Sequence, residues 1–230
     1  GHRCEGPDGA ECDRSYSTPS SIGQLRSKLR SYGVKLTGNW KGHVNEQWAV
    51  FFGVELVGTQ FAYERGLGES ASEAFKNVFD HIDIKWEYGA GNCGASTNVT
   101  SGGCTNNANY IRFWSLSGHG QGDITRMTKN VVHELGHAYN ASIGYGPSTD
   151  LDINREDLRL DRDIFLRPNP GDPRHYDWQQ HPPAMDEAGW SGTETFADMF
   201  IAWTYDAWNL DVNNAERVTD AQTWMSQWMP

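Results

Sequence analysis

Residues 128–140 read Thr-Lys-Asn-Val-Val-His-Glu-Leu-Gly-His-Ala-Tyr-Asn, an apolar-rich run that contains the motif His133-Glu134-Leu135-Gly136-His137. If this run is a helix, residues four apart lie on the same face, one turn apart. The imidazoles of His133 and His137 can then approach a single metal ion. Glu134 lies about 100° around the helix from His133, where it can reach the open position of that ion. Two histidines and an adjacent carboxylate on one helical turn are typical of a zinc hydrolase.

A catalytic zinc site needs three protein ligands, so a third must come from elsewhere in the chain. Asn140 and Ile143 occupy the positions where a metzincin carries Gly and His, which excludes that class. The best source is the segment Glu194-Thr195-Phe196-Ala197-Asp198, whose two carboxylates lie four apart and therefore on one helical face. We predict that Glu194 binds the metal and that Asp198 accepts the far N–H of a ligating imidazole, which fixes its tautomer.

Each of these assignments has an alternative. His133 and His137 could be core histidines, Glu194 could be a helix N-terminal residue favoured by the helix dipole, and Asp198 could face solvent. His119 lies between glycines and is expected to be a loop residue. Other side chains could also supply the third ligand, namely Asp150, His175, His181, Asp186 and Glu187.

At these two segments the sequence resembles the gluzincins, zinc peptidases with HExxH and a glutamate on a second helix. HELGH followed by ExxxD is similar to the thermolysin-type pattern, and residues 194–200, ETFADMF, resemble the lethal-factor-like secreted bacterial peptidases. The resemblance covers two helices, and the gap between them is longer than in thermolysin-like enzymes. No residue matches the Tyr or His that stabilises the oxyanion in the family. The candidates for that role are Tyr145, His175, Tyr176 and His181.

The resemblance implies an α+β fold of the zincin-like metallopeptidase type, in a single catalytic domain. A small mixed sheet and the HExxH helix would form an N-terminal lobe, residues 1–142, and a mainly helical lobe, residues 143–230, would carry the third ligand. The substrate would be a peptide or protein, and Glu134 would move a proton from water to the leaving amine. Zincins bind the substrate along an edge strand that precedes the HExxH helix. Here that strand would comprise Tyr110, Ile111, Arg112, Phe113 and Trp114.

Hydrophobic periodicity supplies the other expected elements. Helices are predicted near 22–33, at 45–65, near 72–82, from 123 or 125 through the HExxH motif, at 193–208 and at 215–228, and strands at 34–37, 82–88 and 110–116. We expect the last two strands to form a hairpin across a loop rich in Gly, Asn, Ser and Thr. Residues 144–189 show little periodicity, so they are either functional or locally folded.

The four cysteines fall into two close pairs, Cys4 with Cys12 and Cys93 with Cys104, neither with CxxC spacing. Two local disulfides are therefore expected, which implies an oxidising compartment and a secreted protein. The net charge of −11 argues against a nucleic-acid partner, and the lack of a long apolar run argues against a membrane span. We expect a monomer.

Two other functions stay open: a degenerate zincin that binds zinc or a partner without catalysis, and a zinc hydrolase acting on a non-peptide amide. A calcium site is a further alternative. Asp150, Asp152, Asn154 and Asp161 echo the spacing of an EF-hand loop, but Arg155 occupies the position that needs glycine. A solvated acidic loop is the favoured interpretation of that stretch.

Overall fold

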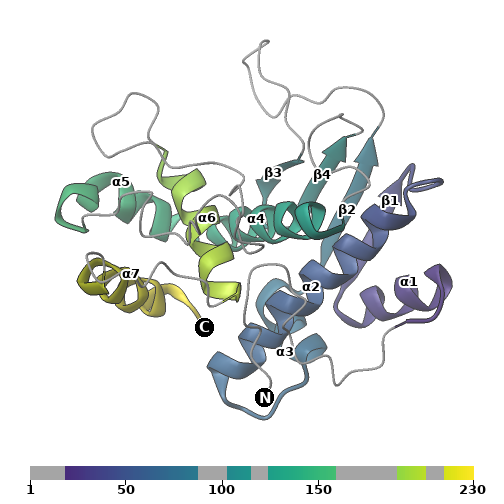
Figure 1. The fold of residues 1–230 in the computed structure, drawn as a ribbon, viewed down its shortest axis with the longest axis horizontal. Helices are drawn as coiled ribbons and strands as arrows, with labels where there is room; N and C mark the ends of the chain where they lie inside the picture. The colour runs from purple at the N-terminus through teal and green to yellow at the C-terminus, as the bar shows by residue number, and fades with distance from the viewer. Residues whose placement is uncertain (1–18, 88–102, 115–123, 159–190, 206–214) are drawn as a thin grey trace, which may run out of the picture.

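The computed structural model of the protein describes residues 19–87, 103–114, 124–158, 191–205 and 215–230. The predicted α+β class is confirmed, because the described part is a mixed α+β fold with one small mixed sheet (Figure 1). In chain order its elements are α1 (Ile22–Ser31), β1 (Val34–Gly38), α2 (Val44–Arg65), α3 (Ala71–Phe79), β2 (Ile82–Glu87), β3 (Gly103–Asn107), β4 (Tyr110–Trp114), α4 (Ile124–Ser142), α5 (Gly146–Leu158), α6 (Gly192–Tyr205) and α7 (Ala215–Trp228).

The four strands lie in the order β1-β2-β4-β3. Strand β2 runs parallel to both β1 and β4, and β3 runs antiparallel to β4. The predicted hairpin between residues 82–88 and 110–116 is therefore wrong, because those two strands are parallel neighbours. The hairpin joins β3 to β4 instead. Strand β3, with the sequence Gly-Cys-Thr-Asn-Asn, was expected to be loop because it has no alternation of apolar and polar residues.

The predicted substrate strand is also wrong as an edge strand. Strand β4, residues Tyr110, Ile111, Arg112, Phe113 and Trp114, lies between β2 and β3, so its backbone is paired on both sides. Among the described strands, β3 and β1 form the two edges of the sheet. Strand β3 is the edge that packs beside α4, the helix with the HExxH motif.

Capping side chains begin helices α1 and α3, and a glycine ends helix α2. Ser21 caps α1 by accepting a hydrogen bond from the backbone N–H of Gln24, and Ser70 and Glu73 form a reciprocal capping box at α3. Helix α2 ends at Gly66, which adopts the left-handed conformation with φ of 61°. Within the described residues, none of the helices combines the length and the apolar character needed to cross a membrane.

Helix α5 occupies the start of the segment with little periodicity, so that part is locally folded. Cys104 in β3 is disulfide-bonded, and no described cysteine is free. Its predicted partner Cys93 and the predicted pair Cys4 and Cys12 lie outside the described residues.

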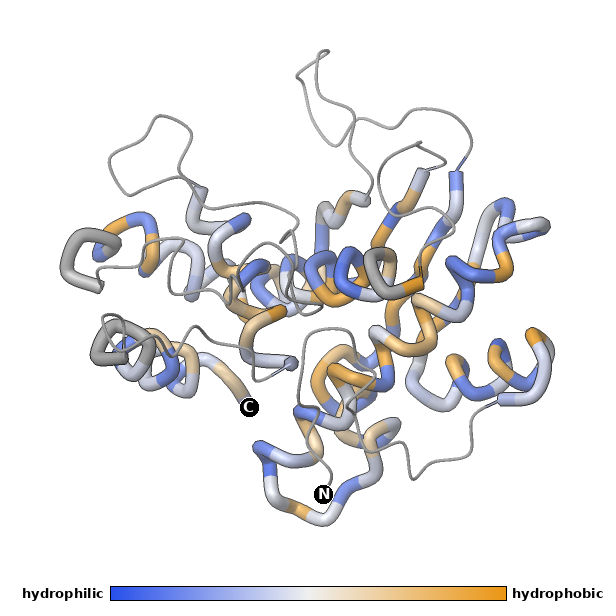
Figure 2. The backbone as a smooth tube through the Cα atoms, in the orientation of Figure 1, coloured by the Kyte–Doolittle hydropathy of each residue, from blue (hydrophilic) through white to orange (hydrophobic). Residues whose placement is uncertain are grey.

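A single hydrophobic core joins the elements on both sides of residue 142. Phe61 of α2 lies near its centre, and its ring centroid is 5.8 Å from that of Tyr139 in α4 and 5.4 Å from that of Trp203 in α6. Figure 1 shows α4 between the sheet with α1–α3 and the group α5–α7, and Figure 2 shows apolar residues along α2 and α4. The packing around Phe61 therefore fixes how α6 lies against α4.

Replacing Phe61 by Ala tests this core. The side chain is fully buried, and its removal leaves a cavity, so the free energy of unfolding should fall by about 3–5 kcal/mol. Tyr63→Ala, on the exposed face of the same helix, is the matched control and should change it by about 0.5 kcal/mol or less. Denaturant titration measures both, and equal losses would contradict a core centred on Phe61.

Candidate metal centre

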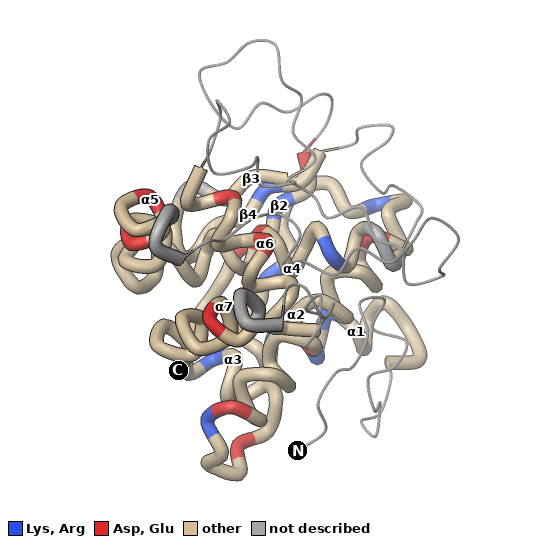
Figure 3. The backbone as a smooth tube through the Cα atoms, turned by 60° about the vertical axis from the view of Figure 1, so that its left-hand side comes forward, with Lys and Arg blue, Asp and Glu red and all other residues tan. Residues whose placement is uncertain are grey.

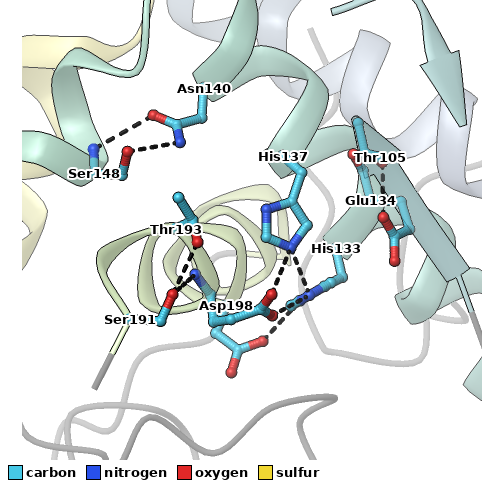
Figure 4. A network of polar contacts seen from close by, with 10 residues as sticks. Thr105, His133, Glu134, His137, Asn140, Ser148, Ser191, Thr193 and Asp198 are labelled. Atoms are coloured by element: carbon cyan, nitrogen blue, oxygen red, sulfur yellow. Dashed lines mark hydrogen bonds and ion pairs between the residues drawn. The ribbon is translucent and has the colours of Figure 1, made fainter. Parts of the chain in front are cut away.

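Three side chains from two helices lie close enough together to hold one metal ion, and Figure 4 shows the two that come from α4. Helix α4 contributes His133 and His137, and α6 contributes Glu194. The two Nε2 atoms lie 3.1 Å apart, Oε2 of Glu194 lies 3.1 Å from Nε2 of His133, and Oε1 lies 3.4 Å from Nε2 of His137. The helix over Ile124–Ser142 thus stacks both imidazoles on one face, and the structure brings Glu194 to them.

The spacing of these atoms fits a small tetrahedral metal ion. Zinc–ligand distances of about 2.0–2.1 Å place neighbouring ligand atoms of a tetrahedron about 3.3 Å apart. The two Nε2 atoms, 3.1 Å apart, lie close to that value, and each lies within 3.4 Å of one oxygen of the Glu194 carboxylate. His133 is 4% exposed and Glu194 is 40% exposed, so one side of the cluster is open to solvent. Two imidazoles and one carboxylate could therefore hold a metal ion and leave a position for a further ligand.

Asp198 contacts the Nδ1 side of the His133 ring, away from the other two side chains of the cluster. Its Oδ1 atom lies 2.9 Å from Nδ1 of His133, so it can accept the Nδ1 proton, and the neutral ring in that tautomer would offer its Nε2 lone pair to a metal ion. Asp198 is fully buried, and its Oδ2 atom has no hydrogen-bond partner among the described residues. A buried carboxylate with one unsatisfied oxygen destabilises a fold, so its presence is best explained by its contact with His133.

The carboxylates of Asp198 and Glu194 favour a positive charge between them, either on the imidazoles or on a metal ion. Burial opposes charge on His133, but its hydrogen bonds with Asp198 and Glu194 hold its pKa well above the ordinary value. Burial raises the pKa of Asp198 to about 6, against the opposing hydrogen bond with His133. Burial likewise opposes charge on Glu194, but the hydrogen bonds with His133 and His137 lower its pKa. A metal ion can replace the proton on the imidazoles and satisfy the same carboxylates.

Gly136 lets α4 and α6 approach closely enough for these contacts. A Cβ atom there would lie 2.9 Å from Cβ of Phe200 and 3.1 Å from Cα of Ala197, both in α6. The N-terminus of α6 is held in turn by α5, because the backbone N–H of Gly192 donates to Oδ1 of Asp152 at 2.8 Å. Glycine inside the HExxH motif is therefore a packing requirement of this site.

Glu134 projects from α4 toward Thr105 of β3 (Figure 4). Its side chain is 5% exposed, and the hydroxyl of Thr105 donates to its Oε2 atom at 2.7 Å. A Cβ atom at Gly103 would lie 2.6 Å from Oε1, so glycine leaves the room that the carboxylate needs. Thr105 and Gly103 were not predicted, because both fall in a polar stretch that carries no periodic signal.

One candidate oxyanion stabiliser, Tyr145, lies in the described part of the chain and does not join the cluster. Tyr145 lies in the turn after α4, 45% exposed, and no described contact links it to the histidines. Other candidate ligands and oxyanion stabilisers lie outside the described residues, namely His175, Tyr176, His181, Asp186 and Glu187, as does His119, which was expected to be a loop residue.

The EF-hand interpretation is wrong, because Asp150, Asp152 and Asn154 lie on helix α5 and not on a loop. Asp150 accepts hydrogen bonds from the indole N–H of Trp224 at 2.6 Å and from Asn154 at 2.7 Å. Asp152 binds the start of α6, as described above. These carboxylates hold helices together, so the favoured alternative of a solvated loop is wrong as well.

Comparison with protein-family models, curated proteins and solved structures found no match to the chain. The gluzincin resemblance therefore stays a prediction from the two motifs. What the structure adds is the convergence of His133, His137 and Glu194 into a group that could hold a metal ion.

Replacing Gly136 by Ala tests the close approach of the two helices. Alanine favours a helix by about 1 kcal/mol over glycine, but the added methyl group must push α6 away from α4. We expect zinc affinity to fall about 10–100-fold, the range seen when groups that orient metal ligands are disturbed. Gly23→Ala in α1 is the matched control, because only Ser21 Oγ, at 3.9 Å, lies near the new methyl group. Competition with a chromophoric chelator measures both, and an unchanged affinity in Gly136→Ala would contradict the packing argument.

Proposed function

We propose that the protein is a secreted, zinc-dependent peptidase of the gluzincin type. The observation that carries the proposal is the convergence of His133, His137 and Glu194, with Asp198 behind His133. Spacing alone predicted all four residues, and their contacts fit the roles that the motif implies. The zincin-like fold belongs to the same proposal, supported by a small mixed sheet beside the HExxH helix.

Zinc is the metal that this ligand set favours. Two neutral imidazoles and one carboxylate at tetrahedral spacing suit zinc better than calcium or magnesium, which prefer oxygen ligands in larger or octahedral shells. A zinc ion bound there would supply Lewis acidity that activates water and polarises a carbonyl group. In our proposal His133, His137 and Glu194 would hold it, and Asp198 would keep His133 in the tautomer that binds metal.

Glu134 would be the general base. It neighbours His133 on α4 and projects toward β3, and in our proposal it would act on a water molecule without taking a ligand position. The hydroxyl of Thr105 holds one carboxylate oxygen at 2.7 Å, which limits the rotation of the side chain. Glu134 would accept the proton of the attacking water and deliver it to the leaving amine. A degenerate zincin that only binds metal has no use for a carboxylate fixed in this position.

Strand β3 is the element best placed to bind a peptide. Its backbone pairs with β4 on one side, and among the described strands it has no partner on the other. An extended peptide added at that edge would pass beside Thr105 and Gly103, which contact the general base. This placement favours a peptide over another amide as substrate. The disulfide-bonded Cys104 supports secretion.

Glu134→Gln is the test of this function. Zinc content should stay stoichiometric, because the ligands are unchanged, while turnover should fall about 100–10,000-fold with the loss of the base. The assay is digestion of a peptide library with and without chelator, read by mass spectrometry, with metal content measured on the same samples. The exposed Glu64→Gln on α2 is the matched control and should cleave like the unmodified protein.

Two results would contradict the proposal. Cleavage that survives in Glu134→Gln would remove the general base from its role. A zinc-loaded protein that cleaves no peptide, but hydrolyses another amide or only binds a partner, would favour one of the alternatives.

A further inference from the structure

A pocket lies at the opposite edge of the sheet from the metal centre. Its volume is about 470 Å³, and it is lined by α1, β1 and the start of β2. Strand β1 is one edge of the sheet, and β3, beside the HExxH helix, is the other. Two strands separate these edges, so the pocket is independent of the proposed peptidase site.

The charge of this pocket is opposite to that of the chain. The chain carries a net charge of −11, yet Arg26, Arg30 and Lys35 all line the pocket, with Asp83 as the acidic residue facing them. His81, whose Nδ1 atom lies 2.9 Å from Oδ2 of Asp80, also lines it. Arg26 and Arg30 lie four apart on α1 and therefore on one face (Figure 3 marks the basic and acidic positions). Clustered cations in an acidic protein favour an anionic ligand.

Arg26 is held in place by a buried side chain. Its Nε atom donates to Oε1 of Gln47 at 2.9 Å. Gln47 is 3% exposed, and its own amide donates to the backbone carbonyls of Trp40 at 3.0 Å and His43 at 3.2 Å. This chain of contacts uses only Nε of Arg26. Its two terminal nitrogens have no hydrogen-bond partner in the described part of the chain, so they can bind the two oxygens of a carboxylate or phosphate.

The free edge of β1 adds backbone donors. The carbonyl of Gly33 accepts from Ile82 at 3.1 Å, and the N–H of Asn39 donates to Trp86 at 3.0 Å, so odd-numbered residues of this strand face β2. Because backbone groups alternate along a strand, those of Val34 and Leu36 point away from β2. Both residues line the pocket. Guanidinium groups and backbone N–H groups that point away from the neighbouring strand are donors that can recognise an oxyanion.

We propose that this pocket is a binding site for a small ligand that carries a carboxylate or phosphate group. Arg26 and Arg30 bind the anionic group, Lys35 adds charge, and the N–H groups at the β1 edge orient it. The volume suits a small molecule rather than an ion alone. The site makes no use of His133, His137 or Glu194, so it stands whether or not the protein is a peptidase.

The test is a titration with inorganic phosphate and, separately, with citrate, at constant ionic strength. Calorimetry gives the affinity, and the backbone amide shifts of Val34 and Leu36 locate the bound anion. We expect saturable binding of at least one anion with shifts at both amides. Phosphate binding alone identifies a phosphate ligand, and citrate binding alone identifies a carboxylate ligand.

The variant Arg30→Met/Lys35→Met removes two exposed charges and leaves the Arg26–Gln47 contact intact, so it should fold normally. Its affinity should fall about tenfold or more, the effect of losing charged hydrogen bonds. Lys41→Met/Lys76→Met removes two exposed charges away from the pocket and should change affinity less than about twofold. Absence of saturable binding, shifts confined to other amides, or equal weakening in both double variants would overturn the proposal.

Discussion

Helices α4 and α6 meet at Gly136, where a single methyl group would lie 2.9 Å from Cβ of Phe200. This contact decides whether Glu194 and Asp198 reach the histidines, because both carboxylates project from α6 and both imidazoles from α4. The aromatic residues packed around Tyr139, Phe196 and Phe200 stabilise the helix pair through apolar burial. Hydrophobic packing thereby offsets the cost of burying Asp198 and of gathering charged side chains at one point.

Two different faces of helix α4 contact α6 and β3. One face presents His133 and His137 to α6, and another presents Glu134 to Thr105 of β3. The step of about 100° between adjacent helical residues separates these faces, so the ligands and the carboxylate do not compete. The metal ligands therefore depend on helix packing, while the orientation of Glu134 depends on the register of the sheet.

Strong hydrophobic periodicity made several helices predictable, and the fixed spacing of the two motifs made the site residues predictable. The bounds of α2, α4 and α7 follow apolar patterns, and the ExxxD spacing pointed to Glu194 and Asp198. The sheet was harder to predict because strand partners lie far apart in the chain. Nothing in Gly103–Asn107 signals a strand, since β3 is placed by its pairing with β4 and by its contact with α4. Helix α5 depends in the same way on the long-range contact of Asp150 with Trp224.

The central claim is that His133, His137 and Glu194 bind one zinc ion. Anomalous difference maps collected on either side of the zinc absorption edge, from crystals of protein that was purified without added metal and then exposed to stoichiometric zinc, test it most directly. We expect one strong peak bonded to Nε2 of both histidines and to the carboxylate of Glu194. A protein that takes up no zinc, or a peak held by other residues, would contradict this account.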